Sequence, residues 1–572
     1  MEVIIVLLVI YAVFLYVMIR GAHDEKKRKQ KYRTYLKNLY GSFPETAPGA
    51  EGFARIESSF RHAAGDKMAE GMIDDITWND LDMDGIFARM NFTQSSAGEE
   101  TLYRMLRCPA LSDDVQTKRT MENHISYMMS DEAVRLDALM LLEEMGQSGT
   151  YALADYLDYI NGLGTRSNAK HYLCILLLAA SVVSVFAYPS FGVVLLIAAA
   201  CFNIVTYVSQ KGVASTYVTA IAYIMRMLEC ADGIVGLGLG SVFAAYTDAV
   251  KEKRAKFKSL EKNSGMVLRL NSATGNAGDI VFDYIKMLTH IDLIRFNKVI
   301  GIIGRYERDI CEIADCIGYL DAVISIAYFR AALPYSCVPV LSKGKNDTFV
   351  IKDGFHPCIE NPVANSISQS RGMIVTGSNA SGKSTFLKTV AINAILAQSI
   401  HTCCAKSYSG NYYRIYSSMS LRDSLEHGES YYMVEIKAIK RIVDAALLDS
   451  ANPLLCFVDE VLRGTNTVER IAASVQILKK LSQQGIYCFA ATHDIELTQL
   501  LEREYDNFHF EEEVRDGDVL FSYRLLRGRA HTRNAIRLLE IIGFSQDIIR
   551  QADDMAGTFL RTGEWSVKGT LY

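Results

Sequence analysis

The chain is 572 residues long, with 50% hydrophobic residues, 22% charged residues and a formal net charge of −5 at pH 7. This length predicts several domains, and the small net charge argues against a basic nucleic-acid-binding protein. The same composition argues against a transporter that is embedded in the membrane over most of its length.

The N-terminus combines an apolar run with a basic flank. Seventeen apolar residues end at Ile19, and eight lysines and arginines follow between Arg20 and Lys37. The run has the minimum length of a membrane helix. A cleavable signal peptide, the alternative, would carry its positive charge before the apolar run and a small-residue cleavage site after it. We therefore predict an uncleaved transmembrane anchor over residues 1–20 and a cytoplasmic basic flank and linker over residues 21–74. Pro44, Pro48 and several glycines indicate that residues 38–74 form a loosely structured linker.

A second apolar region lies in the middle of the chain. Residues 172–210 contain no charged side chain, and a YPSFG turn signal interrupts them at Pro189. We predict a transmembrane hairpin over residues 170–211, with Lys170 and Lys211 keeping both ends in the cytoplasm. The alternative is a buried helical hairpin within a soluble helical domain. With the anchor, this makes a multi-pass protein of the cell membrane.

The rest of the chain divides by its periodicity. Helical patterns occupy residues 75–169 and 212–339, on either side of the hairpin. Strands and helices alternate over residues 340–530, and a helical tail follows over residues 531–572. The fold predicted is an all-α domain, interrupted by the hairpin, followed by an α/β domain.

The most specific motif is MIVTGSNASGKSTFLKTVAI, which begins at Met373. It places an apolar strand, a glycine-rich loop with GxxxxGKS spacing and a helix in succession. In such a loop the backbone N–H groups and the helix N-terminus bind phosphate, the lysine reaches the terminal phosphates and the serine hydroxyl binds Mg²⁺. The predicted nucleotide-binding residues are Gly377, Ser378, Asn379, Ala380, Ser381, Gly382, Lys383, Ser384 and Thr385.

Two further apolar strands end in chemically active side chains. LLCFVDE ends at Asp459 and Glu460, and YCFAATHD carries His493 near its end. The carboxyl ends of parallel strands face the ligand in α/β sheets. We predict that Asp459 holds Mg²⁺ together with Ser384, and that Glu460 orients or deprotonates the attacking water. His493 is predicted to sense the terminal phosphate, so the catalytic residues would be Glu460, His493 and Lys383.

These motifs resemble the ATPase domain of the MutS family, a branch of the ABC-type P-loop ATPases. TGSNASGKST resembles the family's TGPNxxGKST, with Ser378 in place of proline, and DEVLRGTNT and ATHDIELTQL resemble DEIGRGTST and ATHYxELxxL. Residues 423–436, DSLEHGESYYMVEI, resemble a third family segment. The resemblance implies that Asn379 contacts phosphate and that Ser430 reaches the nucleotide of a partner subunit in a homodimer. The family's aromatic adenine contact has Val363 at its nearest position, so the adenine contact stays open.

Looser similarities cover the helical parts. Residues 75–169 and 212–339 resemble the helical core and levers of the MutS family, and residues 531–572 resemble its dimerisation region. In that family the mismatch-recognition and connector domains precede the core, and neither fits residues 1–74. We therefore expect a membrane-anchored variant that lacks both.

The predicted function is a MutS-like ATPase that uses ATP and Mg²⁺ at composite sites of a dimer and moves helical levers at the membrane or against an unknown protein partner. One alternative is a tethered DNA-binding factor for repair or recombination, which predicts salt-dependent DNA affinity. Another is an ABC-type transporter component, against which stand the low number of predicted spans and the missing LSGGQ signature. The sequence leaves the substrate open, and also whether DNA binds.

Overall fold

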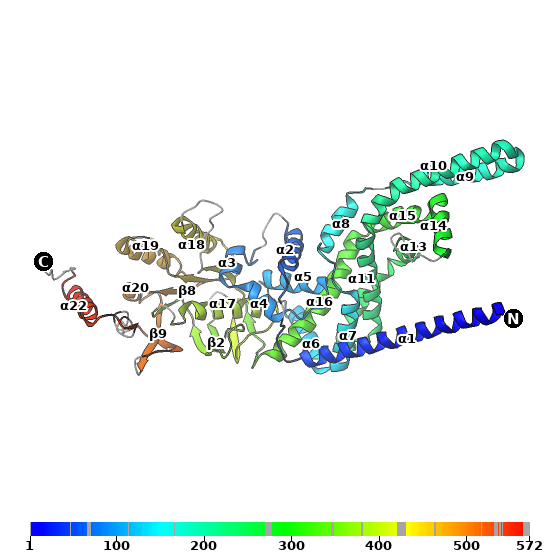
Figure 1. Cartoon of the computed structure of the whole chain (residues 1–572). Coiled ribbons are helices and arrows are strands. Elements are labelled where there is room, and N and C mark those ends of the chain that lie inside the picture. Colours follow the sequence, from blue (N-terminus) through cyan, green and yellow to red (C-terminus); the bar gives the residue numbers. More distant parts are fainter. Residues whose placement is uncertain are drawn as a thin grey trace. The chain divides into compact units, whose positions relative to one another are not determined.

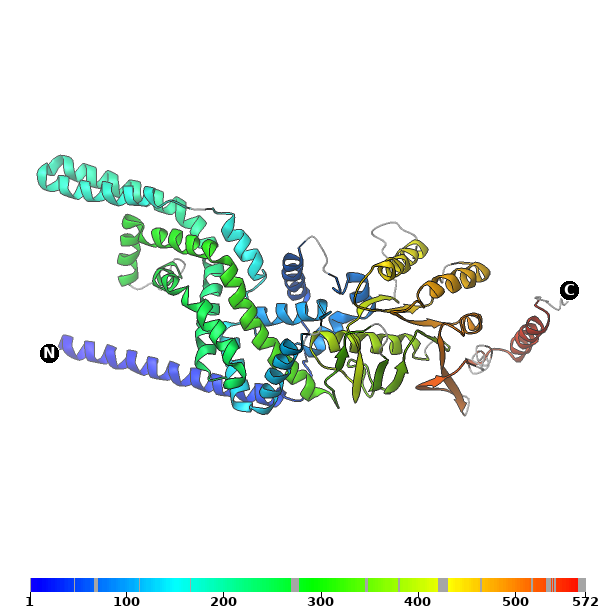
Figure 2. The ribbon, with the colours of Figure 1, turned by 180° about the vertical axis from the view of Figure 1, so that it is seen from behind.

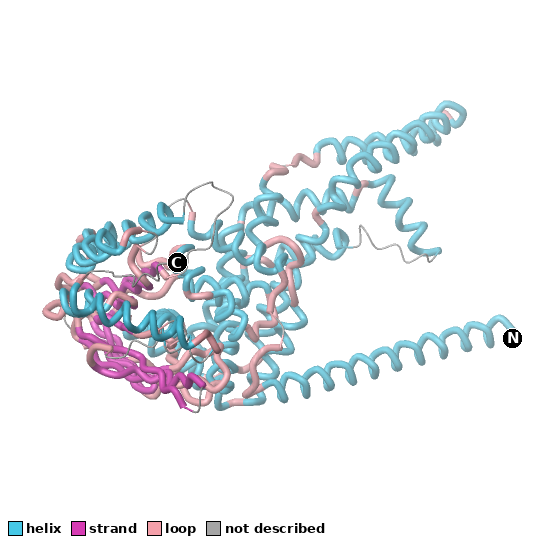
Figure 3. Tube along the Cα trace, turned by 60° about the vertical axis from the view of Figure 1, so that its left-hand side comes forward, coloured by secondary structure: helices cyan, strands magenta, loops and turns pink. Residues whose placement is uncertain are grey.

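The chain folds into two compact units, each assembled from separate stretches of sequence. The helical unit comprises residues 1–67, 90–104 and 116–332, and the sheet unit comprises residues 68–89, 105–115 and 333–572. The computed structural model describes the chain apart from residues 1, 46, 66–69, 113, 165, 269–276, 345–347, 379–380, 420–430, 463–464, 516–517, 531–535, 537–538, 540–541 and 564–572. A mixed α/β domain at the C-terminus after a helical N-terminal region is confirmed (Figures 1 and 3).

The helical unit contains helices of very different length. They are α1 (Glu2–Leu39), α2 (Ala50–Ala64), most of α5 (Ser96–Arg107), α6 (Val115–Ser130), α7 (Glu132–Met145), α8 (Leu153–Asn161), α9 (Ala169–Ala187), α10 (Pro189–Thr216), α11 (Val218–Gly236), η1 (Ser241–Phe243), α12 (Ala244–Ala255), α13 (Lys258–Leu268), α14 (Ala277–Thr289), α15 (Ile291–Arg305) and α16 (Glu307–Ala332).

Helix α1 joins the expected anchor to the basic flank without a break. Most side chains of the expected anchor, residues 1–20, lie outside the described part of the structure. In the basic flank, α1 packs on α7 through three ion pairs, and the member residues repeat at intervals of four along α1. The pairs are Lys29–Glu144, Arg33–Asp137 and Lys37–Glu132.

The segment expected to be a loose linker contains a helix. Helix α2 lies within residues 38–74 and is held by the buried ion pair between Arg55 and Glu99 of α5. Ser59 also donates a hydrogen bond to Glu100, 2.6 Å away. The prolines and most of the glycines that suggested a linker lie outside α2, in the turns before and after the helix.

Helices α9 and α10 form the expected hairpin, and they lie side by side in both opposite views (Figures 1 and 2). Pro189 occupies the first position of α10, where a missing N–H leaves no hydrogen bond unmade. Among the described residues, these two helices are long and apolar enough to cross a membrane, and few of their residues are buried. Length and composition are the basis of that assignment.

The sheet unit is built on two sheets. The larger sheet has the strand order β10-β9-β4-β8-β7-β6, with parallel pairing except between β9 and β10, and the smaller has the order β1-β5-β2-β3. Their strands are β1 (Val340–Ser342), β2 (Phe349–Gly354), β3 (Asn365–Gln369), β4 (Met373–Thr376), β5 (Ser407–Asn411), β6 (Arg414–Ser418), β7 (Leu454–Asp459), β8 (Ile486–Thr492), β9 (Asp506–Arg515) and β10 (Asp518–Arg527).

Helices cover both faces of the larger sheet. Helix α17 is almost entirely buried between the two sheets, and α18 and α19 lie on the other face of the larger sheet (Figure 1). Apolar side chains of β7, β8, α18 and α19 form the core on that face. The helices are α3 (Asp75–Asp80), α4 (Met83–Met90), α17 (Lys383–Ser399), α18 (Tyr431–Leu447), α19 (Thr467–Lys480), α20 (Ile495–Leu500) and α22 (Gln546–Thr562).

Helix α3 belongs to the sheet unit although it precedes most of the helical unit in sequence. Asp80 accepts a 2.7 Å hydrogen bond from Ser417 Oγ, and Thr77 Oγ1 accepts one from Ser417 N. The residues expected to open the helical core, 75–169, are therefore divided between the two units. Buried polar groups of this kind pair across large sequence separations, so local periodicity does not reveal them.

Candidate active site

The turn from β4 into α17 carries most of the predicted nucleotide-binding residues. All four residues of β4 are buried, and α17 begins at Lys383. Gly382 has a φ of 101°, and a Cβ at Gly377 would lie 2.8 Å from Ser381 Oγ. These two positions therefore favour glycine, and the N-terminus of α17 opens onto the loop, where it is suited to bind an anion.

Lys383 and Ser381 supply polar groups that fit phosphate. The buried ammonium of Lys383 donates to the carbonyl oxygens of Gly377 and Ser378, at 2.7 Å each. Ser381 is 2% exposed, and its hydroxyl has no hydrogen-bond partner among the residues that the structure describes. Buried hydroxyls are normally bonded, so a phosphate oxygen would satisfy this one.

Ser384 and Asp459 meet at the same edge of the sheet. Ser384 Oγ, in the first turn of α17, donates a hydrogen bond to Asp459 Oδ2 at the end of β7. Strand β4, which leads into α17, and strand β7 both pair in parallel with β8, so their carboxyl ends lie at one edge of the sheet. A hydroxyl and a carboxylate are oxygen ligands that suit Mg²⁺ completed by water and phosphate.

Glu460 and His493 form the next contact. His493 Nε2 lies 2.8 Å from Glu460 Oε1 and 3.4 Å from Lys383 Nζ. Glu460 has a φ of 58°, and its backbone N–H donates to Ala491 O at 2.9 Å. A left-handed glutamate costs about 1 kcal/mol, and such strained conformations concentrate at functional sites. His493 thus contacts both of the other residues predicted to be catalytic, Glu460 and Lys383.

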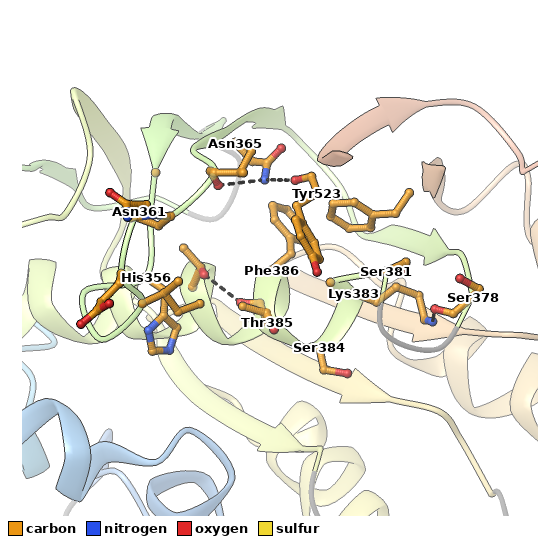
Figure 4. Close-up of a pocket in the computed structure, with 18 of the residues that line it drawn as sticks. His356, Asn361, Asn365, Ser378, Ser381, Lys383, Ser384, Thr385, Phe386 and Tyr523 are labelled. Carbon is orange, nitrogen blue, oxygen red and sulfur yellow. Dashed lines mark hydrogen bonds between the residues drawn. The ribbon is translucent and has the colours of Figure 1, made fainter. Parts of the chain in front are cut away.

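A cavity of about 520 Å³ lies against the loop and the start of α17 (Figure 4). This volume is within the range of small-molecule sites. Ser378, Ser381, Gly382, Lys383, Ser384, Thr385 and Glu460 form its polar part. The remaining lining consists of Gly354, His356, Ile359, Glu360, Asn361, Pro362, Val363, Asn365, Phe386, Thr389, Phe510 and Tyr523.

Tyr523 is a lining residue that sequence reasoning missed. It lies on β10, where the pairing with β9 shifts between Phe521 and Leu525. Asn365 Nδ2 donates to Tyr523 O at 3.0 Å, and Leu525 N donates to Asn365 Oδ1 at 2.8 Å, so the irregular strand is held at the cavity (Figure 4). A tyrosine within a strand is common, and nothing in the sequence distinguishes this one.

His356 and Val363 also border the cavity, beyond the phosphate-binding loop. Burial, and secondarily the charge of Lys388, lowers the pKa of His356 to about 4. The imidazole is therefore neutral at physiological pH. Val363, the position nearest to the family's aromatic adenine contact, lines this cavity, and its carbonyl oxygen accepts a hydrogen bond from Asn365 Nδ2 at 3.4 Å.

The remaining residues of the predicted nucleotide site either lie outside the described residues or make other contacts. Asn379, Ala380 and Ser430 lie outside the described residues. Thr385 is exposed in the first turn of α17, and Ser378 donates a hydrogen bond to Glu512. Within the described part of the chain, no three His, Cys, Asp or Glu side chains are arranged to hold a metal ion, so any Mg²⁺ would depend on ligands from nucleotide and water.

Comparison with known proteins places the sheet unit in a family. Residues 373–559 match the model of MutS domain V. The chain is 30% identical to the DNA mismatch repair protein MutS of Thermotoga maritima over 267 residues, which are 45% of this chain and 33% of that protein. It is 29% identical to MutS protein homolog 4 of Mus musculus over 297 residues, 48% of this chain and 30% of that protein.

An archaeal relative gives the same result, since the DNA mismatch repair protein MutS of Methanothrix thermoacetophila is 30% identical over 275 residues, 46% of this chain and 31% of that protein. The chain spans about a third of the length of these curated relatives. The match to domain V includes β4, the loop, α17, β7 and β8, which carry the described catalytic candidates. The C-terminal α/β region of the chain is therefore related to domain V of the MutS family.

Proposed function

We propose that this chain is a membrane-anchored, MutS-like ATPase that binds and hydrolyses ATP with Mg²⁺ at composite sites of a homodimer. One observation carries the proposal. Lys383, the Ser384–Asp459 pair and the Glu460–His493 pair converge at the edge of one cavity, although they come from α17 and from the ends of β7 and β8.

Each side chain then has a role in phosphoryl transfer to water. Lys383 exchanges its bonds with the Gly377 and Ser378 carbonyls for bonds with the terminal phosphates. Ser384 and Asp459 hold Mg²⁺, which when bound neutralises charge on the phosphates. Glu460 orients the attacking water and accepts its proton.

His493 acts beside Glu460 at the terminal phosphate. Its Nε2 contacts Glu460 Oε1 and lies near Lys383 Nζ, so the imidazole bridges the base and the phosphate-binding cation. An Nε2–H group that donates to Glu460 in the absence of nucleotide can donate instead to a phosphate oxygen when ATP binds. This exchange would make Glu460 available to the water.

The aromatic end of the cavity is proposed to bind the adenine. Tyr523 and Phe386 line it together with the neutral His356. Aromatic rings stack on bases regardless of hydrogen-bonding pattern, so this end would hold the base while the loop holds the phosphates.

The composite site requires a second subunit. The proposal assigns Ser430 to the nucleotide of the partner and residues 531–572 to dimerisation, in accord with the family resemblance. Helix α22 lies in this tail, and Ile542, Phe544 and Ile548 nearby expose much of their apolar surface. Apolar side chains of this kind favour burial in a subunit interface.

The membrane part of the proposal rests on the hairpin. Phe186 is 86% exposed and Val183 66% exposed, and most large apolar side chains of α9 and α10 are likewise uncovered. Such a surface is costly in water and favourable in lipid. We propose that the hairpin spans the cell membrane, that the α1 anchor spans it too, and that the ATPase lies in the cytoplasm.

A polar junction offers a path from the hairpin to the helical unit. Tyr207 of α10 donates a 2.6 Å hydrogen bond to Asp292 of α15, and His171 Nδ1 of α9 lies 3.0 Å from His290 Nδ1. Asn203 of α10 donates to Leu288 O at 2.8 Å. All these side chains are buried, so moving α14 and α15 would move the hairpin with them. This junction supports levers that act on the membrane segment.

The ATPase proposal is tested with the purified full-length chain in detergent. The parent should hydrolyse ATP in the presence of Mg²⁺, and Lys383→Ala should reduce ATP affinity and turnover by about a hundredfold or more, since it removes the buried cation of the loop. Hydrolysis by Lys383→Ala at the parent rate would refute the catalytic assignment.

The topology is tested by labelling in intact cells. A Ser190→Cys variant in the hairpin turn should react with a membrane-impermeant maleimide above the background of the parent, whereas Gln483→Cys in the sheet unit should react only after lysis. Labelling of both positions, or of neither, in intact cells would contradict the proposed spans.

Lever movement has its own test, which uses spin labels on the hairpin turns of a dimer. ATP added to Glu460→Gln should change the distance between the two labels, because only a ligand with different affinities for two states shifts their populations. An unchanged distance would refute coupling of the ATPase to the hairpin.

The names of the relatives favour a second candidate, a tethered DNA-binding factor in repair or recombination. Its test is binding of the solubilised dimer to duplex DNA at several salt concentrations, with and without ATP. Affinity that falls steeply with salt would support it, since phosphate contacts release counterions. No binding at low salt would exclude it.

A further inference from the structure

An ion pair between Arg470 and Asp494 lies next to the Glu460–His493 contact. Arg470 of α19 donates from Nε to Asp494 Oδ2 at 2.9 Å and from its terminal nitrogen to Asp494 Oδ1 at 2.6 Å. The pair is therefore bidentate, with the side chains only 24% and 15% exposed. Planar, two-bond pairing fixes geometry as well as charge, which a lysine does not reproduce.

Asp494 is the residue that follows His493, so the ion pair anchors the backbone that carries the imidazole. Asp494 N also donates to Thr492 Oγ1 at 3.0 Å, which closes the turn around His493. The His493 side chain itself is 35% exposed, so packing constrains its ring only in part. Its position therefore depends on how its backbone is held, and Arg470 supplies a contact from another helix.

A small cavity connects these groups. It has a volume of about 120 Å³, and its lining consists of Glu460, Val461, Arg470, Thr492, His493 and Asp494. Glu460 also lines the larger cavity proposed for ATP. The space has room for a few water molecules and enough polar partners to hold them. The Arg470–Asp494 pair thus borders both the imidazole and the water-sized space beside the proposed base.

Arg470 lies outside the motifs that suggested the function, and Asp494 departs from the family's pattern within one of them. Asp494 occupies the place of tyrosine in the ATHYxEL motif, and Arg470 lies three residues beyond the end of DEVLRGTNT. The pair joins positions 24 residues apart, on the helix after β7 and in the turn after β8.

We propose that Arg470 is a positioning residue for ATP hydrolysis, which through its bidentate pair with Asp494 holds His493 in contact with Glu460. This inference rests on the proposed ATPase function. Arg470 binds neither nucleotide nor water in this role. It therefore affects kcat, whereas the Kd for ATP is determined by the phosphate-binding loop. Because α19 carries Arg470, a shift of this helix would displace His493 from the proposed base.

The test compares ATP affinity with turnover in full-length variants. Arg470→Ala should lower kcat by about tenfold to a hundredfold, since small displacements of catalytic groups have effects of this size, and should change the Kd for ATP by less than about twofold. Arg470→Lys should restore only part of kcat, because it gives one bond instead of two. The exchange Arg470→Asp with Asp494→Arg should restore more activity than either single change.

A matched control is available in the same unit. Arg371 also donates two hydrogen bonds to an aspartate, Asp506, but it lies in the turn just before β4 rather than beside Glu460. Arg371→Ala should leave kcat near the parent value. An equal loss in both arginine variants would assign Arg470 to general stability and overturn the proposal.

The outcomes separate this inference from the proposed function. If the parent shows hydrolysis that Lys383→Ala abolishes, while Arg470→Ala keeps the parent kcat, then only the role of Arg470 is refuted. If Arg470→Ala loses ATP affinity as strongly as kcat, the residue supports the fold of the loop, and the positioning role is also refuted. If the parent has no Lys383-dependent hydrolysis, the proposed function is refuted, and so is the positioning role of Arg470, which depends on it.

Discussion

Tyr523 provides a sharp test of how the nucleotide lies in the cavity. Its ring lines the cavity close to Gly382, since a Cβ on that glycine would lie 3.1 Å from Tyr523 Cδ1, and the residue is 44% exposed. Replacement by alanine would remove the ring and leave the phosphate-binding loop intact. Because the proposed contact is with the base, Tyr523→Ala should weaken the binding of ATP more than the binding of a phosphate chain without a base.

The expected size follows from the surface available for stacking. Aromatic stacking on a base contributes about 1–3 kcal/mol. The exposed fraction of Tyr523 indicates that only one part of the ring is free to meet a base, so we expect about 1–2 kcal/mol. This corresponds to an increase in the Kd for ATP of roughly 5- to 30-fold.

The assay is isothermal titration with ATP and, separately, with inorganic tripolyphosphate. Tyr523→Phe is the matched control, because it keeps the ring and should remain within about twofold of the parent. Tripolyphosphate affinity should be the same in all three proteins. If Tyr523→Ala bound ATP like the parent, or lost both ligands equally, the placement of the base beside Tyr523 would be refuted.

Two further predictions concern the loop and the helical unit. Gly382→Ala should weaken ATP binding by about tenfold, because the residue has a φ of 101° and the added Cβ would lie 3.1 Å from Tyr523 Cδ1; Gly212→Ala, with nothing within 4 Å, should bind like the parent. Burial raises the pKa of Asp321 to about 7, above the ordinary value of 3.8, although Ser95 donates to its carboxyl group. The neutral form is thus favoured on folding, so this stability is fully present below about pH 4 and is lost as the pH rises through about 7, with about 2 kcal/mol lost between pH 5.5 and pH 8. Thermal unfolding in detergent should show a lower midpoint at pH 8, and Asp321→Asn should reduce the difference; an unchanged pH dependence in that variant would contradict the assignment.

The parts of the site that could be predicted are those encoded locally. An apolar strand followed by GxxxxGKS, or ended by Asp459 and Glu460, is visible in a few consecutive residues because strand, loop and helix each have a local pattern. Parallel pairing then brings such strand ends to one edge. The hairpin of α9 and α10 was predictable for the same reason, since hydrophobic length and a Pro-containing turn are properties of one segment.

The rest depends on pairing between distant residues. Tyr523 reaches the cavity through an irregular register with β9 and through Asn365, more than 150 positions earlier. The Arg470–Asp494 pair, like the burial of α2 through Arg55, arises only when separate helices come together. Prolines and glycines on either side of α2 predicted a linker there. That prediction ignored the helix-forming residues between them.

In the proposed mechanism, Glu460 activates water at a site that binds ATP through Lys383 and Ser384. This role is tested by the rate of γ-phosphate release by Glu460→Gln under single-turnover conditions, with the Kd for ATP measured on the same preparation. We predict a rate at least about a hundredfold below that of the parent, with the Kd within about twofold and with Glu504→Gln behaving like the parent. Release of phosphate by Glu460→Gln at the parent rate would show that Glu460 does not activate the water.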